Sequence, residues 1–264
     1  MASTTRSPRR SSATAEPPTR EQLGAHKLSP EVGFYLTSRG YGLPSCVPAI
    51  KTPEPGELLR DARFDPARVD RVLAAFSALR HTKGEWAGKP LRPDAWQVAY
   101  VMAPVFGWVR KNASGDYVRV IRDVYLDVPR RNGKSTLAGG IALYLTAADG
   151  EPGAEVVAAA TTTHQASFVF SPVKSLVQSA PMLQGHLVPR QFRIMHPASG
   201  SYFEVVSSAA DAQHGANLHG AIIDELHIHK SADLVESLDP ELQARLGDAG
   251  GDTGASRRDR KSVV

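Results

Sequence analysis

The sequence predicts an α/β protein with a mostly parallel sheet flanked by helices. The main observation is that, after Asp116, short runs rich in β-branched and aromatic residues alternate with longer runs of helical periodicity. Strands that alternate with helices in this way are typical of a parallel sheet covered on both faces. A second observation agrees: 42% of the 264 residues are hydrophobic, which is enough to bury one sizeable core.

Two helices are predicted before the alternating region. Apolar residues recur at helical spacing over 66–80, which indicates an amphipathic helix. A second apolar-periodic segment begins at Asp94, a residue type that caps helix N-termini, and runs to about Met102. Pro104 is expected to end or kink it, because proline lacks the backbone N–H that a helix interior needs.

The alternating region begins with a predicted strand at 117–128 and a polar turn at 129–135. The predicted elements that follow are a helix at 135–147, a strand at 154–160, a helix at 164–179, and strands at 191–195, 202–207 and 220–224. This order supplies the strand–helix alternation on which the fold class rests.

Composition divides the chain into four parts and excludes several classes of protein. Residues 1–27 are predicted to form a disordered basic tail, 28–64 an extended Pro/Gly-rich lead-in, 65–246 the folded domain and 247–264 a second disordered tail. A basic arm can contact nucleic acid, but a solvated tail is the favoured interpretation. No apolar run approaches the roughly 18 residues of a membrane-spanning helix, and the amino-terminal segment lacks the apolar core of a secretory signal. A single cysteine, Cys46, excludes a disulfide framework and fits a reducing cytoplasm.

The turn at 129–136 has the composition of a phosphate-binding loop. It lies between a predicted strand and a predicted helix, so its backbone N–H groups and the helix dipole would face an anion. Gly133 lets the backbone approach closely, the Lys134 ammonium would reach the β- and γ-phosphate oxygens, and the Ser135 hydroxyl would ligate Mg²⁺. The full motif has a further glycine where this chain has Val128. The alternative is an ordinary left-handed turn with a solvent-facing lysine.

An apolar strand that ends in two carboxylates is the expected partner of such a loop. Ile222 and Ile223 precede Asp224 and Glu225. Asp224 would hold Mg²⁺ through water, and Glu225 would accept a proton from the water that attacks the γ-phosphate. The alternative is a strand that runs into an exposed acidic turn. Together with Lys134 and Ser135, the pair predicts a P-loop NTPase-like domain that hydrolyses a nucleotide with Mg²⁺.

The order of these motifs resembles the amino-terminal ATPase part of the tailed-phage terminase large subunit, over about residues 60–240. The segment 91–97 (LRPDAWQ) is similar to the adenine-contacting segment of that family. The segment 128–135 (VPRRNGKS) is similar to its variant phosphate loop, which replaces the first glycine and carries arginine. Residues 158–170 resemble the strand-to-helix segment that follows, and 208–217 resemble the stretch before the acidic strand end.

The resemblance implies roles for further residues. Gln97 would contact the adenine edge, with Trp96 packed nearby. Arg130 or Arg131, with Arg131 preferred, would stabilise charge on the transferring phosphoryl group. The implied nucleotide-binding residues are Trp96, Gln97, Arg130, Arg131, Asn132, Gly133, Lys134, Ser135 and Thr136, the catalytic residues Glu225 and Arg131, and the metal ligands Ser135 and Asp224.

The resemblance also implies partners and a place of action. Mg²⁺-dependent ATP hydrolysis would drive double-stranded viral DNA into a procapsid, with the small terminase subunit and the capsid portal as partners. A ring-shaped homo-oligomer is expected when the protein is complete, without a membrane and in the host cytoplasm.

Two parts of the family's pattern are missing after Pro240. The family has a further strand, normally placed between the phosphate-loop strand and the Asp-Glu strand, but no apolar run of that kind follows here. The final segment 262–264 is judged too short to supply it. The acidic cluster of the family's nuclease domain is also missing, so DNA cleavage is not expected. A truncated or frame-shifted coding sequence, with a sheet incomplete at its C-terminal side, is the favoured explanation.

Other interpretations remain open at this point. The chain would alternatively be a non-catalytic fragment that binds nucleotide, the small subunit or the portal without turnover, or another DNA translocase ATPase. A zinc site formed by His219, His227 and His229 is disfavoured, because no further ligand lies at a motif spacing.

Overall fold

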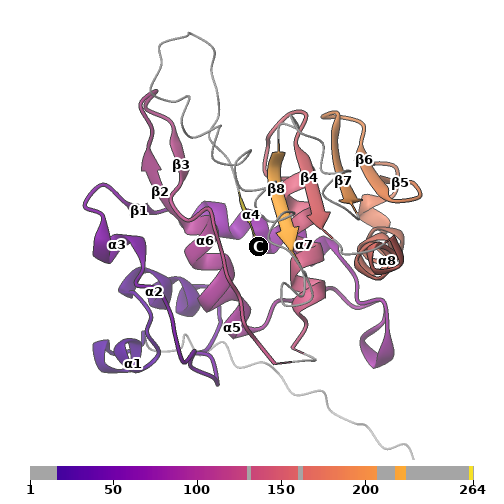
Figure 1. The fold of residues 1–264 in the computed structure, drawn as a ribbon. Helices are drawn as coiled ribbons and strands as arrows, with labels where there is room; N and C mark the ends of the chain where they lie inside the picture. The colour runs from indigo at the N-terminus through magenta and orange to yellow at the C-terminus, as the bar shows by residue number, and fades with distance from the viewer. Residues whose placement is uncertain (1–16, 130–131, 160–162, 207–217, 224–261, 264) are drawn as a thin grey trace, which may run out of the picture.

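The computed structural model of the chain describes residues 17–129, 132–159, 163–206, 218–223 and 262–263. Figure 1 shows a helical part with a small sheet beside a larger sheet, with helix α4 between them. Both parts contribute to one continuous hydrophobic core. Among the described residues, no helix combines the length and the apolar character that crossing a bilayer requires.

Three short helices form the amino-terminal part, namely α1 (Arg20–Ala25), α2 (Pro30–Ser38) and α3 (Pro55–Leu58). The Thr19 hydroxyl caps α1 and the Ser29 hydroxyl caps α2. Val32, Tyr35 and Leu36 of α2 are buried in the core, which explains why this segment is helical within a Pro/Gly-rich stretch. Thus α1 lies in the segment predicted as a tail, and α2 and α3 lie in the predicted lead-in. The proposed domain boundaries themselves stay predictions.

A three-stranded antiparallel sheet follows, in the order β1 (Arg63–Phe64), β2 (Trp108–Lys111) and β3 (Tyr117–Arg119). The Trp108 indole N–H donates to the buried Glu54 carboxylate at 2.9 Å, which ties this sheet to α3.

The strand predicted over 117–128 is wrong beyond Arg119. Residues 120–129 belong to no named strand, although Asp123 forms an isolated bridge. Their side chains still alternate, because Val124 and Leu126 pack against the core whereas Tyr125 is 81% exposed. The segment therefore has the side-chain pattern of a strand without the backbone pairing that defines one.

The predicted amphipathic helix is confirmed as α4 (Pro66–Ala78), followed by a short 3₁₀ helix, η1 (Gly84–Trp86). The next predicted helix is longer than expected. It comprises α5 (Ala95–Gln97), a π-helical stretch η2 (Val98–Met102) and α6 (Ala103–Gly107).

Of the two effects predicted for Pro104, an end or a kink, the first is wrong, because the helix continues through Pro104 to Gly107. The Ala103 N–H bonds to the Val98 carbonyl five residues back, so a wide π turn immediately precedes the proline. A wide turn changes which carbonyls face the proline ring, and the chain stays helical to Gly107.

The larger sheet has six strands in the order β5-β6-β7-β4-β8-β9. They are β4 (Glu155–Ala159), β5 (Val188–Pro189), β6 (Arg193–His196), β7 (Ser201–Val206), β8 (Leu218–Ile223) and β9 (Ser262–Val263). β7, β4, β8 and β9 are parallel, whereas β5 and β6 pair antiparallel at one side. The α/β prediction is confirmed, with a mixed rather than a wholly parallel sheet.

The two faces of the central strand β4 point into different apolar clusters. Val156 and Ala158 belong to the main core, and Val157 and Ala159 belong to a second cluster with residues of β8. A strand buried on both faces is typical of a parallel sheet.

The edge of β8 is paired by a strand that the sequence did not predict. Ser262 and Val263 form β9, in parallel register with Gly220 and Ala221. The segment therefore pairs with the sheet, but β9 has only two residues and is shorter than the further apolar strand that the family pattern leads one to expect.

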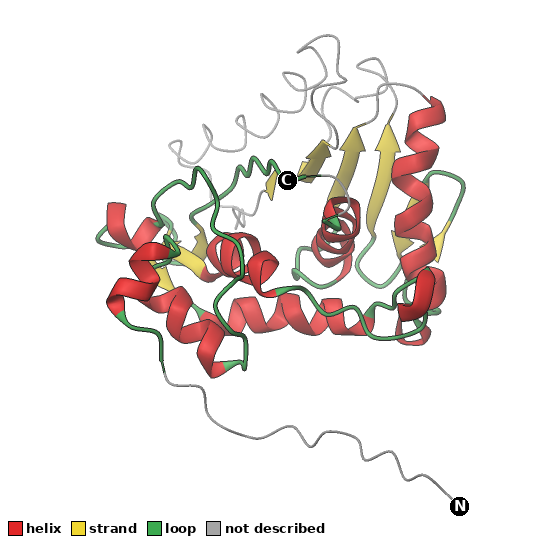
Figure 2. Ribbon diagram, turned by 90° about the horizontal axis from the view of Figure 1, so that it is seen from below, coloured by secondary structure: helices red, strands yellow, loops and turns green. Residues whose placement is uncertain are grey.

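Helix α7 (Lys134–Ala147) lies between α4 and α8 (Thr163–Ser179) and packs on β4, β7 and β8 (Figures 1 and 2). A short 3₁₀ helix, η3 (Pro181–Leu183), follows α8. Two adjacent glycines permit this packing. A methyl group on Gly139 would lie 3.1 Å from Val173 of α8, and one on Gly140 would overlap the Phe76 ring of α4.

We expect Gly140→Ala to lower the free energy of unfolding by about 1–2 kcal/mol. Overlap with Phe76 costs about 1–3 kcal/mol, and the better helix propensity of alanine offsets only part of it. The matched control is Gly24→Ala in α1, where no atom lies within 4 Å and no loss is expected. Urea denaturation measures both, and equal stability of the two variants would contradict the packing described.

Candidate functional site

The first turn of α7 is the part of the predicted phosphate-binding turn that the structure describes. Gly133 occupies the N-cap position with φ 73° and ψ 17°, the left-handed region that favours glycine. The Leu137 N–H bonds to the Gly133 carbonyl at 2.9 Å, which closes the first helical turn. The Asn132 side-chain amide donates to the Pro129 carbonyl at 3.1 Å and folds the turn back on itself.

No side chain caps α7 among the described residues. The N–H groups of a first helical turn have no acceptor within the helix, and the helix dipole is positive there. Lys134 and Thr136 are half-buried at this end, and Ser135 is exposed. The arrangement therefore presents backbone donors, an ammonium and a hydroxyl to an anion.

Gln97 reaches this turn from α5, across 36 positions of sequence. A Cβ on Gly133 would lie 3.5 Å from Gln97 Nε2. The other end of the amide is occupied, because Gln97 Oε1 accepts the Asp94 N–H at 2.9 Å in a capping box. This bond fixes the orientation of the amide, so the donor end faces the turn. Trp96 beside it is half-buried against the core.

The acidic strand end lies outside the described residues. β8 ends at Ile223, directly before Asp224 and Glu225. Arg130 and Arg131 lie outside the described residues as well. The roles predicted for these four side chains therefore stay predictions.

The orientation of α7 relative to β8 follows from contacts at their other ends. Asp149, just beyond the end of α7, accepts from His219 Nε2 at 2.8 Å, and His219 lies near the start of β8. The end of α7 is thus beside the start of β8. Because α7 packs along β8, the start of α7 lies toward the carboxyl end of that strand. Lys134 therefore lies toward the end of β8 at which Ile223 is located.

No group of three or more His, Cys, Asp or Glu side chains that could hold a metal ion occurs within the described ranges. His219 is 1% exposed and bonded to Asp149, so it is part of the interior. His227 and His229 fall outside the described residues. The candidate magnesium ligands are oxygen donors, Ser135 and Asp224, and hard oxygen donors suit Mg²⁺.

The sequence analysis missed a buried polar cluster at the far end of α7. We call Arg119, Tyr144, Asp149 and His219 the Asp149 cluster. Asp149 Oδ2 accepts from both Arg119 Nη1, at 2.9 Å, and His219 Nε2. Burial raises the pKa of the Tyr144 hydroxyl, and the negative charge of Asp149 raises it further. No motif marks these residues, and the one sequence signal is an arginine within a β-rich run.

The family described as "Terminase large subunit, ATPase domain" matches residues 95–248, more than half of the chain. The large terminase subunit of Enterobacteria phage HK97 is 27% identical over 162 residues, which are 60% of this chain and 30% of that protein. The crystal structure of the HK97 large terminase aligns with a TM-score of 0.56 at 21% identity, covering 74% of this chain and 37% of that chain. The chain thus spans about a third of the length of these relatives.

We expect Gly133→Ala to destabilise the protein by about 1 kcal/mol, because an L-residue in the left-handed region is strained. Gly42→Ala is the control, since Gly42 has no positive φ and open space around its Cβ position. Thermal denaturation of both variants checks this, and a Gly133→Ala protein as stable as the unmodified chain would be incompatible with the observed turn.

Proposed function

The chain belongs to the family of terminase large-subunit ATPase domains, and we propose that it hydrolyses ATP with Mg²⁺ to drive double-stranded viral DNA into a procapsid. The observation that carries the proposal is the start of α7, where a left-handed glycine opens a helix without a side-chain cap among the described residues. Such a terminus is a site for phosphate oxygens.

Binding of the triphosphate would use the turn and the first residues of α7. The Lys134 ammonium and backbone N–H groups would neutralise phosphate charge, with Asn132 shaping the turn and Thr136 beside it. Arg131, or Arg130 in its place, would stabilise charge on the transferring phosphoryl group.

The Ser135 hydroxyl and the Asp224 carboxylate would hold Mg²⁺, which supplies charge neutralisation at the phosphates. Glu225 would orient the attacking water and accept its proton. Hydrolysis then breaks the bond between the γ-phosphorus and the bridging oxygen, and the products are ADP and inorganic phosphate. The parallel alignment of β8 and β4, which pairs Ile223 with Ala159, supports this assignment, because both strands end at one edge of the sheet.

Gln97 would contact the purine through its donor end alone. Its Oε1 already accepts the Asp94 N–H, so Nε2 is the group available to a ring nitrogen. Trp96, half-buried next to it, would pack near the base. A donor-only contact favours a purine acceptor such as N7, which adenine and guanine share.

The proposed partners follow from the family. They are double-stranded viral DNA, the small terminase subunit, the capsid portal and further copies of the complete protein in a ring. The proposed place of action is the host cytoplasm during phage assembly, and nuclease activity is not expected of this chain.

A second candidate function is nucleotide or partner binding without turnover. The short pairing of the β8 edge supports it, because only Ser262 and Val263 pair there among the described residues. A sheet edge held by so few backbone bonds is weakly stabilised beside the segment that would carry Asp224 and Glu225.

We expect Lys134→Ala and Glu225→Gln each to reduce steady-state ATP hydrolysis by about a hundredfold or more, the usual cost of removing one group that stabilises developing charge. Chelation of Mg²⁺ should abolish activity in the unmodified chain. Lys83→Ala, which changes an exposed lysine outside the site, is the control. Phosphate release in a coupled assay is the measurement. Equal rates in all of these proteins would remove the assignment, and nucleotide binding without release would establish the second candidate.

A pair of Gln97 variants separates recognition from structure. Gln97→Glu keeps an acceptor for the Asp94 N–H but loses the Nε2 donor, whereas Gln97→Ala loses both. We expect Gln97→Glu to retain stability within about 0.5 kcal/mol and to bind ATP about tenfold more weakly. Gln97→Ala should lose both stability and affinity. Nucleotide titration and thermal denaturation check this, and wild-type affinity in Gln97→Glu would remove Gln97 from the site.

A further inference from the structure

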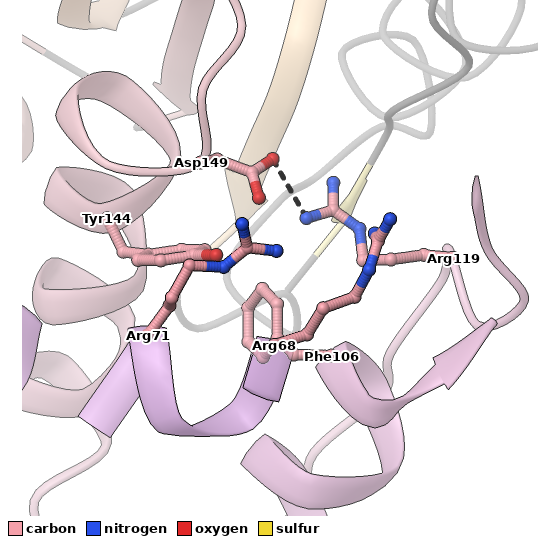
Figure 3. A pocket seen from close by; sticks show the side chains of 6 residues that line it. All are labelled: Arg68, Arg71, Phe106, Arg119, Tyr144 and Asp149. Atoms are coloured by element: carbon pink, nitrogen blue, oxygen red, sulfur yellow. Dashed lines mark hydrogen bonds and ion pairs between the residues drawn. The ribbon is translucent and has the colours of Figure 1, made fainter. Parts of the chain in front are cut away.

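A small polar pocket lies between α4, α6, β3 and the carboxyl end of α7 (Figure 3). The residues that line it are Arg68, Arg71, Phe106, Arg119, Tyr144 and Asp149. Arg68 and Arg71 come from α4, and Arg119 faces them from the end of β3. Three guanidinium groups therefore converge on one place.

Arg119 is buried, yet two of its three guanidinium nitrogens have no hydrogen-bond partner. Its exposed fraction is 3%, and its Nη1 donates to Asp149 at 2.9 Å. Its Nε and Nη2 atoms are inaccessible to solvent and have no hydrogen-bond partner. The Nδ1 atom of His219, in the Asp149 cluster, is likewise buried without a hydrogen-bond partner. Phe106 lies 5.5 Å from the guanidinium carbon and supplies a ring face but no acceptor atom. A buried donor without an acceptor is costly, so an acceptor is expected to complete this site.

The described lining of the pocket carries a net positive charge, which favours an anionic acceptor. Three arginines face one lining carboxylate, Asp149, whose Oδ2 already serves Arg119 and His219. Arg68 also approaches Asp65, at 3.7 Å, and donates to the Tyr117 carbonyl at 2.6 Å. Among the described residues of the lining, and with Asp65 included, positive charges outnumber negative ones. Guanidinium groups of like charge gather stably around an anion.

We propose that this pocket binds a phosphate group, with one of its oxygens inserted against Arg119 and the rest held by Arg68 and Arg71. The cavity volume of the pocket is about 10 Å³, roughly the space that one water molecule needs. It therefore admits a single oxygen and excludes a nucleoside. Arg71 is exposed, so its guanidinium can close over the remaining oxygens at the mouth.

Phosphate fits the donors better than a carboxylate does. One arginine satisfies a planar carboxylate through two parallel bonds, whereas a tetrahedral oxyanion offers acceptors in several directions. Here the donors come from α4 on one side and β3 on the other (Figure 3). The source is either free inorganic phosphate or the backbone of a nucleic acid, since both present such an oxygen.

The pocket is separate from the candidate nucleotide site. It adjoins Asp149, beyond the carboxyl end of α7, whereas Gly133 and Lys134 are at the amino end. A helix of 14 residues spans about 20 Å. The inference therefore does not rest on ATP hydrolysis and can be tested without it.

The test is calorimetric titration of inorganic phosphate into the full chain carrying Lys134→Ala, which weakens phosphate binding at the start of α7. We expect millimolar phosphate to bind this protein, and a further Arg71→Gln change to weaken binding about tenfold. Arg119→Lys keeps the positive charge but loses the planar set of guanidinium donors, and it should weaken phosphate binding to a similar extent. Arg60→Gln, an exposed arginine outside the pocket, is the matched control and should leave binding unchanged. Circular dichroism establishes that each variant is folded.

Three results would overturn the proposal. They are no phosphate binding in the Lys134→Ala chain, equal binding in the Arg71→Gln, Arg119→Lys and Arg60→Gln proteins, and acetate binding as tight as phosphate. A final arm identifies the source with a short DNA duplex that lacks terminal phosphates. If the duplex displaces phosphate, and if this displacement is lost in the Arg71→Gln protein, the pocket is assigned to a nucleic-acid backbone. Unchanged phosphate affinity in the presence of the duplex assigns it to free phosphate.

Discussion

The packing of α7 is the constraint on which the rest of the structure depends. Its adjacent glycines bring α4 and α8 close, and its apolar side chains fill the core beneath the larger sheet. At its carboxyl end, Asp149 links it to His219 of β8 and to Arg119 of β3. The helix is therefore fixed along its sides and at one end, and the turn that contains Gly133 is held at the other.

Much of the fold was predictable because the spacing of apolar residues along the sequence indicates which side of a helix or strand is buried. The helices over 66–80, 135–147 and 164–179 and the strands near 154–160, 202–207 and 220–224 appear within a few residues of the predicted bounds. The failures concern backbone pairing, which side-chain patterns do not encode. Residues 120–129 have the side-chain alternation of a strand but form no named strand, whereas Ser262 and Val263 have no strand pattern and do pair with β8.

Some residues of the candidate site were predictable from local sequence, others only from the family resemblance, and the Asp149 cluster from neither. Gly133 follows from local chemistry, because a glycine before an apolar helix suggests a left-handed cap. The approach of Gln97 to Gly133 came from family resemblance, since no spacing rule connects positions 36 residues apart. The Asp149 cluster was not predictable from either, because Arg119, Asp149 and His219 meet only when a small sheet, a helix and a central strand are packed together.

The π turn before Pro104 has a consequence for the base contact proposed for Gln97. Compared with a regular α-helix, a π turn contains one additional residue, and each residue advances a helix by about 100°. The extra residue in Val98–Met102 therefore sets the rotation of α5 about the axis of α6. Loss of a single residue from this stretch would make the helix regular and rotate the Gln97 amide by about 100° away from Gly133. The π turn over Val98–Met102 thus sets the direction in which Gln97 approaches Gly133. The number of residues in that stretch is therefore as important as their identity.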